Sequence, residues 1–270
     1  DNRIDRVFAG LRADGKKTVL PFLTAGYPDM GATVALLHEI ERRGGRICEL
    51  GVPFSDPVAD GPVIQASFTA ALKAGLKVND IFAGVARYRQ DGGEMALLAM
   101  LSYSIVFRHG PEEFCRQAAQ AGFDGLIVPD LPLDEAAAFA GLARSACLCN
   151  VMLTAPTTPQ ERRIDIARHT TGFLYYMSVA GITGERKTLP PETLASVAEL
   201  RSHIDAPICV GFGISTPDMV AEVCQAADGA IVGSAIIHRI NDALANGRPR
   251  DELVHAVGDF VESRLKPTLL

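Results

Sequence analysis

The chain has 270 residues, of which 48% are hydrophobic and 21% charged, which is enough apolar material for one large core. Its formal net charge of −6 lacks the basic footprint of nucleic-acid-binding proteins, so we expect no nucleic-acid partner. The longest apolar runs fall far short of the ~20 residues that span a bilayer, and no basic-then-apolar leader opens the chain. We therefore expect a cytoplasmic protein that does not contact the membrane.

Short runs rich in Val, Ile, Leu and Phe alternate with amphipathic stretches, a pattern typical of repeated β-then-α units around a parallel sheet. The eight predicted strands are 18–24, 46–50, 96–100, 125–129, 149–153, 173–177, 207–211 and 229–232. The predicted helices include 4–11 before the first strand, then 30–43, 111–121, 134–144, 159–169, 217–226 and 251–266.

This order predicts an α/β fold, a single (β/α)8 TIM barrel over residues 1–270, in which the extra N-terminal helix caps the bottom of the barrel. Two small domains would need a linker, and no Ser/Gly tract or charge block supplies one. An open, doubly wound sheet is the main alternative. Its dinucleotide fingerprint is absent, because the segment 211–216 lacks the third glycine, although periodicity alone does not exclude it.

The end of the second strand carries the first candidate catalytic residues, because barrels of this kind place function at the carboxyl ends of their strands. Glu49 follows an apolar strand, so we expect it to point into the barrel mouth, where desolvation raises a carboxyl pKa towards neutrality. Asp56 and Asp60 lie in the loop that follows. Each also has a structural interpretation: Asp56 as a turn former before proline, and Asp60 as the N-cap of a helix from 62 to 74.

Glycine-rich segments follow the seventh and eighth strands and predict a phosphate site. Glycines allow a phosphate to approach the backbone, and a helix beginning near Ser234 would present its positive end. The residues concerned are Gly211, Phe212 and Gly213 after one strand and Gly233 and Ser234 after the next. These glycines would otherwise be ordinary turn and C-cap residues, but two such loops in succession favour a phosphorylated substrate.

The loop after the sixth strand, residues 178–187, has glycines three apart at Gly181 and Gly184. Such spacing suits a hinged lid that excludes water, and the plainer interpretation is a long connection. Thr183 within this loop would hydrogen-bond an active-site carboxylate, for which Asp130, at the end of the fourth strand, is the candidate.

Several rival chemistries lack the residues they need. No lysine stands at a strand end for a Schiff base, and the six histidines are scattered without a metal-binding cluster. Isomerisation of a sugar phosphate by a pair of aspartates would require Asp after the first and fifth strands, but Thr24 and Thr154 occupy these positions. The remaining chemistry is acid–base catalysis by carboxylates on a phosphate ester, without a cofactor or metal in this chain.

From Arg3 to Lys266 the chain closely resembles the tryptophan synthase alpha subunit family. The motifs that carry the resemblance are 22–26 (FLTAG), 49–51 (ELG), 53–57 (PFSDP), 59–62 (ADGP), 155–158 (APTT), 181–184 (GITG) and 211–215 (GFGIS). The resemblance implies the lyase reaction of tryptophan biosynthesis, in which indole-3-glycerol phosphate is cleaved to indole and glyceraldehyde 3-phosphate.

The resemblance also assigns roles to individual residues. It implies that Glu49 and Asp60 are the catalytic carboxylates, that Phe22 and Tyr175 line the substrate pocket, and that Gly184, Gly213 and Ser234 contact phosphate. We expect apolar walls to raise the pKa of Glu49 and a more polar loop to keep Asp60 ionised. Asp56 and the lid would face a beta subunit that carries pyridoxal phosphate, in an αββα heterotetramer.

The segment after the third strand departs from that family. It reads Ser102-Tyr103-Ser104, where the family commonly has an aromatic residue at position 102 and Asn at position 104; Cys48 replaces a usual aliphatic residue. Two other interpretations therefore stay open beside an alpha subunit. One is a free-standing indole-3-glycerol phosphate lyase, and the other is a phosphate-ligand-binding subunit that activates a partner with little turnover of its own.

Overall fold

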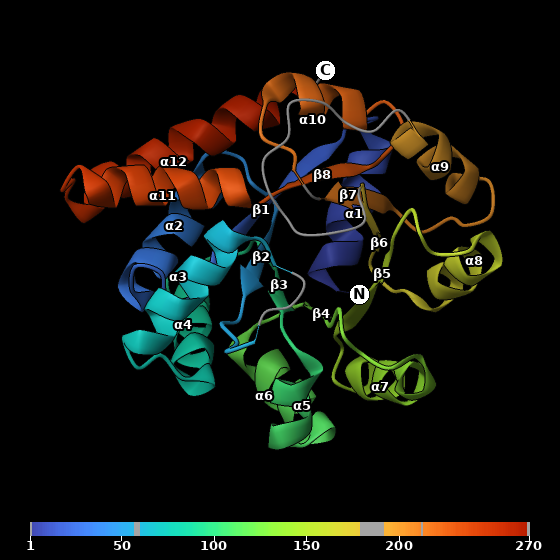
Figure 1. The fold of residues 1–270 in the computed structure, drawn as a ribbon, viewed down its shortest axis with the longest axis horizontal. Coiled ribbons are helices and arrows are strands. Elements are labelled where there is room, and N and C mark those ends of the chain that lie inside the picture. Colours follow the sequence, from blue (N-terminus) through green and yellow to red (C-terminus); the bar gives the residue numbers. More distant parts are fainter. Residues whose placement is uncertain (1, 57–59, 179–191, 212, 269–270) are drawn as a thin grey trace.

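The computed structural model describes residues 2–56, 60–178, 192–211 and 213–268. Eight parallel strands form a closed barrel in chain order, and β1 pairs with both β2 and β8 (Figure 1). The strands are β1 (Thr18–Thr24), β2 (Ile47–Gly51), β3 (Ala96–Met100), β4 (Gly125–Ile127), β5 (Cys149–Thr154), β6 (Leu174–Met177), β7 (Ile208–Gly211) and β8 (Gly229–Val232). The closed ring confirms the predicted TIM barrel and excludes the open sheet.

Helices surround the barrel in the order expected of β-then-α units. They are α1 (Arg3–Ala13), α2 (Met30–Arg42), α3 (Pro62–Lys73), α4 (Val78–Gln90), α5 (Tyr103–His109), α6 (Pro111–Ala121), α7 (Leu133–Ser145), α8 (Gln160–His169), α9 (Glu192–Arg201), α10 (Pro217–Val223), α11 (Ser234–Ala245) and α12 (Arg250–Leu265), followed by the 3-10 turn η1 (Lys266–Thr268). Proline occupies the first turn of α3, α6 and α10, where its missing N–H costs no hydrogen bond.

Alternate side chains along each strand pack into two different hydrophobic cores, one inside the barrel and one between the barrel and the helices. Inward-facing side chains such as Ile47, Leu98 and Ile231 fill the barrel, while their outward-facing neighbours pack against the helices. Ile4 and Phe8 of α1 join the inner core, and the Phe8 ring lies 5.6 Å from that of Phe173. The extra helix therefore closes the amino-terminal end of the barrel, as predicted.

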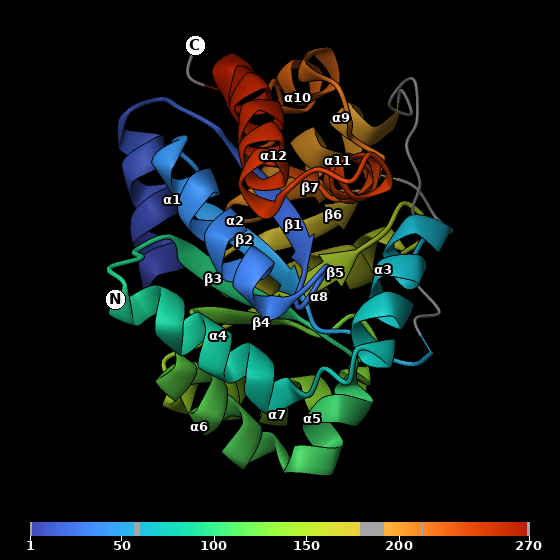
Figure 2. The same cartoon turned by 90° about the vertical axis from the view of Figure 1, so that its left-hand side faces the viewer.

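Figure 2 shows α1 at one end of the barrel and α3 at the other. With one end filled by α1, the loops after the strands surround the opposite end, where α3 and α11 begin. That end is where the sequence predicts the functional residues. Among the residues that the structure describes, no helix is long and apolar enough to cross a membrane.

Candidate active site

Glu49 is held at the centre of the barrel by the alternation of β2. Ile47 faces the inner core, and Cys48 and Leu50 face the helices, so Glu49 points inward beside Phe22, its neighbour in register on β1. Its exposed fraction is 0%, and neither carboxyl oxygen has a hydrogen-bond partner among the described residues. Burial raises the pKa of Glu49 to about 8, which makes it a protonated acid near pH 7.

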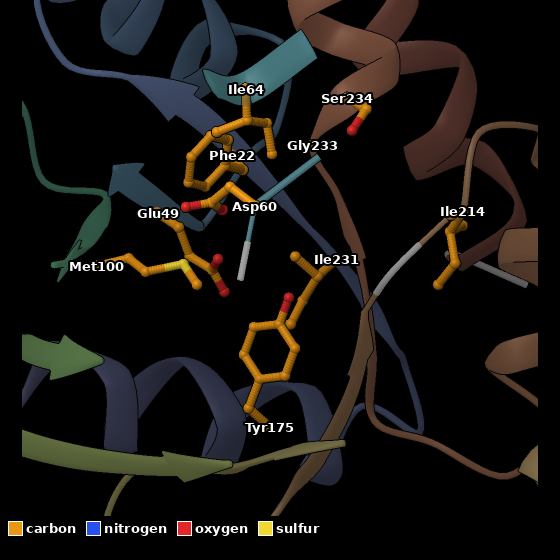
Figure 3. Close-up of a pocket in the computed structure, with 11 residues that line it drawn as sticks. Phe22, Glu49, Asp60, Ile64, Met100, Tyr175, Ile214, Ile231, Gly233 and Ser234 are labelled. Atoms are coloured by element: carbon orange, nitrogen blue, oxygen red, sulfur yellow. The ribbon is translucent and has the colours of Figure 1, made fainter. Parts of the chain in front are cut away.

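Asp60 enters the same cavity from the loop before α3. The N-cap of α3 is Gly61, without a side-chain cap, so the alternative interpretation of Asp60 as the helix cap is wrong. The backbone carbonyl of Asp60 accepts a 2.7 Å hydrogen bond from Gln65 Nε2, which fixes the main chain, and the carboxyl points into the cavity beside Glu49 (Figure 3).

The setting of Asp60 is less polar than we expected, because burial raises its pKa to about 6. The pKa of Glu49 is raised further, so the predicted order of the two carboxyls holds. Near pH 7 Asp60 is mainly ionised and Glu49 mainly neutral. Two carboxyls in one cavity thus differ in protonation state, as an acid and an electrostatic partner require.

A cavity of about 480 Å³ encloses both carboxyls (Figure 3). It brings together seven of the predicted site residues, Phe22, Glu49, Asp60, Tyr175, Gly213, Gly233 and Ser234. Sequence reasoning missed four apolar residues that also line it, Ile64, Met100, Ile214 and Ile231. Its walls are therefore mostly apolar, with the two carboxyls as its charged groups, which suits a flat apolar ring bearing few polar atoms.

Two strand-end glycines make room for the aromatic walls. A Cβ on Gly51 would lie 2.3 Å from the Phe22 ring, and a Cβ on Gly211 would lie 2.3 Å from Tyr175 Oη. Gly211, predicted as a phosphate contact, thus lies against Tyr175 and is not among the residues that line the cavity. Burial, then the charges of Glu49 and Asp60, raise the pKa of Tyr175 well above its usual range, so its phenol stays neutral beside both carboxyls.

Backbone groups dominate the corner predicted to hold phosphate. Gly213 has φ 84°, a conformation that favours glycine, and α11 begins at Ser234 after an N-cap, Gly233, that offers no side chain to cap its N–H groups. The positive end of α11 therefore faces this part of the cavity. Phe212, Thr183 and Gly184, the other residues predicted here, lie outside the described residues.

Asp130 and Asp56 are exposed and belong to a second cavity that adjoins the first through Asp60 and Met100. Asp130 accepts 2.7 Å hydrogen bonds from Ser102 Oγ and from the Tyr103 N–H, so it fixes the start of α5. The Thr183 partner that we predicted for Asp130 lies outside the described residues. Ser102, which departs from the family pattern, thus has a local structural role as the N-cap of α5.

No group of three or more His, Cys, Asp or Glu side chains within the described ranges is placed to hold a metal ion. The arrangement instead pairs a neutral buried carboxyl with an ionised one in an apolar cavity beside a helix N-terminus. Such a site can protonate a carbon atom, stabilise a developing positive charge and hold a phosphate.

The family model for the tryptophan synthase alpha chain matches residues 8–262. The chain belongs to the tryptophan synthase alpha chain family. The alpha chain of Rhodopirellula baltica is 41% identical over 267 residues, which cover 96% of each chain. That of Chloroflexus aggregans is 44% identical over 239 residues, 88% of this chain and 90% of the relative.

Solved structures of the family share the fold over almost the whole chain. Tryptophan synthase subunit alpha from Legionella pneumophila superposes with a TM-score of 0.90 at 35% identity, covering 99% of this chain and 98% of that one. A chain of Mycobacterium tuberculosis tryptophan synthase superposes with a TM-score of 0.87 at 33% identity, covering 100% and 99%. The alpha-chain family and its barrel are thus shown both by sequence and by structure.

Proposed function

We propose that Glu49 and Asp60 are the residues with which this tryptophan synthase alpha chain cleaves indole-3-glycerol phosphate. As a member of that family the chain is a carbon–carbon lyase of tryptophan biosynthesis, and the products are indole and glyceraldehyde 3-phosphate. The observation that carries the assignment is the pair of carboxyls in one apolar cavity, with pKa values raised to about 8 and about 6.

Glu49 acts first as the acid. It donates its proton to the indole carbon that bears the glycerol chain, which makes the ring an electron-poor indolenine. The carbon–carbon bond then breaks, its electron pair returns to the ring, and the Glu49 carboxylate takes the proton of the glycerol hydroxyl as the aldehyde forms. One proton is given and one is taken, so Glu49 ends the cycle protonated.

Asp60 stabilises the intermediate. When the ring carbon is protonated, positive charge develops at the ring N–H, and an ionised carboxylate that accepts a hydrogen bond from this N–H lowers the energy of that state. Glu49 is fully buried and Asp60 partly buried, which strengthens this interaction. The lower pKa of Asp60 supports its assignment as the charged member of the pair.

Phe22 and Tyr175 would hold the indole ring, together with the apolar side chains of Ile64, Met100 and Ile231. The phosphate would lie at the N-terminus of α11, where Gly213, Gly233 and Ser234 line the cavity. Phe212, Thr183 and Gly184 remain predicted parts of this site, and Gly211 makes room for Tyr175 in its wall. No step needs a cofactor in this chain, and the pyridoxal phosphate of the complete enzyme would belong to the beta subunit.

We further propose that the chain assembles with a tryptophan synthase beta subunit in an αββα heterotetramer, in the cytoplasm. Phe107 on α5 is 68% exposed, and a cavity of about 720 Å³ lies between α5 and the segment 52–55. Large exposed apolar side chains beside a concavity favour a protein interface. Asp56 adjoins this region, which supports its assignment to the partner-facing surface.

Residues 1–270 would act as one domain, because the strands of a single barrel span the chain from Thr18 to Val232 and α1 and α12 pack on that barrel. The barrel cannot close without strands from both halves of the chain. Neither half therefore has a complete core of its own.

Indole release from indole-3-glycerol phosphate, measured with and without a tryptophan synthase beta subunit, tests the proposal. We expect turnover that the beta subunit stimulates and that Glu49→Gln lowers about 10³-fold in both conditions. Fast turnover by the chain alone, without stimulation, would identify a free-standing lyase. Absence of indole in both conditions from the unaltered chain would refute the catalytic assignment and leave a ligand-binding activator.

A further inference from the structure

Buried polar atoms without partners gather in one layer outside the barrel. Apart from the Glu49 carboxyl, the described residues include four buried side-chain atoms without a hydrogen-bond partner: Asn150 Nδ2, Thr154 Oγ1, Arg163 Nε and Tyr176 Oη. All four lie on β5, β6 or α8. An unpaired buried polar group costs about 1–3 kcal/mol, and of these four residues Asn150 lines a cavity that a ligand could enter.

Asn150 is the most informative of these residues. Its neighbours Cys149 and Val151 face into the barrel core, so Asn150 faces outward, towards the helices. The residue is only 2% exposed, and its amide nitrogen, which carries two N–H donors, has no acceptor among the described residues.

A cavity of about 580 Å³, open to solvent, lies over Asn150. It is lined by Val128, Pro129, Leu131, Asn150, Val151, Met152, Leu153, Arg162 and Ile166. These residues come from β5, from the segment between β4 and α7, and from α8. The cavity lies beside α8, and α7 and α8 pack against each other less than α6 and α7 do.

Asn150 and Arg162 bring hydrogen-bond donors to this cavity, and no acidic side chain lines it. Arg162 is exposed at the cavity and is paired with no residue that the structure describes. The lining side chains other than Asn150 and Arg162 are apolar. The cavity thus presents one buried amide donor and one cation to a ligand, which calls for an anionic acceptor on an apolar body.

We propose that this cavity is a second binding site, separate from the lyase site, for a small monocarboxylate with an apolar body. The carboxylate takes up the donors of Asn150 and Arg162, and the body packs against Leu131, Met152 and Ile166. A neutral amide of the same shape pairs less well with Arg162, and an amine is repelled by it. None of these residues lines the cavity that holds Glu49.

Benzoate is a suitable probe, with benzamide and benzylamine as neutral and cationic counterparts. The full chain is labelled at its methionine methyl groups, and Met152, which lines the new cavity, is followed by NMR together with Met100, which lines the active site. We expect benzoate to shift the Met152 resonance saturably, with a Kd on the order of 1 mM for so small a ligand. Benzamide should bind more weakly, and benzylamine should leave the Met152 resonance unchanged.

Arg162→Gln should raise the benzoate Kd about tenfold, because it removes a charge-assisted hydrogen bond. Arg168→Gln is the matched control: Arg168 is exposed on the same helix and does not line the cavity, so its loss should leave the Kd unchanged. Asn150→Ser should weaken benzoate and benzamide alike, since it shortens the donor that both use. Indole release by all three variants should equal that of the unaltered chain.

The proposal is overturned if Met152 shows no saturable shift, which would mean that water alone occupies the cavity. It is also overturned if only Met100 responds, which would place benzoate in the lyase site, or if Arg162→Gln and Arg168→Gln weaken binding equally, which would indicate a general charge effect. Since the readout is binding at Met152, these outcomes are independent of whether Glu49 and Asp60 catalyse the lyase reaction.

Discussion

The two ends of the barrel differ in how they surround buried and partly buried carboxyl groups. At the amino-terminal end, Asp228 accepts hydrogen bonds from Arg201 at 2.6 Å and from the Ile208 N–H at 2.9 Å, and lies 3.3 Å from Lys17. Although burial alone would raise the pKa of Asp228, these partners hold it below its usual value. Glu49, at the carboxyl-terminal end, has no partner among the described residues, and its pKa is raised to about 8.

Asp124, at the same end of the barrel, is also surrounded by hydrogen-bond donors. It is 4% exposed and accepts hydrogen bonds from Arg3, Arg89 and the Leu97 N–H at 3.2, 2.9 and 2.9 Å. Carboxyl groups at the amino-terminal end therefore hold strands and helices together through hydrogen bonds, whereas the carboxyl of Glu49 has no partner among the described residues. A carboxyl whose donors are all supplied by the fold cannot give its proton to a substrate, so the missing partners of Glu49 are what its function requires.

The largest effect is expected from Glu49→Gln. Since the acid and base of the reaction are lost together, kcat for indole release should fall by about 10³-fold, measured with saturating indole-3-glycerol phosphate. Glu222→Gln makes the same chemical change at an exposed position on α10 and should leave kcat unchanged. A Glu49→Gln enzyme within about tenfold of the unaltered chain would contradict the assignment.

The same substitution should stabilise the fold in a pH-dependent way. The folded pKa of Glu49, about 8, lies above its ordinary value of 4.5, so the folded state binds more protons between these values. Stability is then lost as pH rises through that window, by as much as about 5 kcal/mol. Urea unfolding should show Glu49→Gln gaining little at the acid end and most near pH 8. An advantage independent of pH would mean that Glu49 titrates normally.

Asp228→Ala should lower the stability of the fold and leave the activity intact, the opposite of Glu49→Gln. It leaves Arg201, Lys17 and the Ile208 N–H without their acceptor, so we expect the free energy of unfolding to fall by about 3 kcal/mol. At a temperature where the variant is folded, kcat should stay close to normal. If kcat fell as far as in Glu49→Gln, the division between the two ends would be wrong.

The pH profile of kcat/KM for indole release should be bell-shaped. Asp60 must be ionised and Glu49 protonated, so the limbs should lie near the values of about 6 and about 8. Asp60→Asn should lower the rate about 10²-fold and remove the acid limb while keeping the alkaline one. An acid limb that persists in Asp60→Asn would assign that titration to another group.

The barrel was predictable because its signals are repetitive. Three strands, β1, β3 and β8, begin and end where the apolar runs predict, and the others differ at their ends by one or two residues. The predicted fourth strand is too long: β4 ends at Ile127, before Pro129, which has no N–H to donate to the sheet.

The sequence predicted the carboxyl groups of the site but not most of the apolar residues that line it. Glu49 stands out because a charge follows an apolar strand, whereas Met100 and Ile231 look like any other core residue in the sequence. Their signal is positional, since each is the inward-facing residue at or next to a strand end. The partners of Asp130 were not predictable, because Ser102 reaches it across a chain separation of 28 residues.

The most direct test of the contrast between the two ends is a carbon-13 NMR titration of the side-chain carboxyl groups in the unliganded chain. Glu49 should titrate near 8 and disappear from the spectrum of Glu49→Gln, while Asp228 should titrate below its ordinary value of 3.8. A Glu49 carboxyl that titrates near 4.5 would contradict the account, because the acid would then be ionised at the pH at which it must donate its proton.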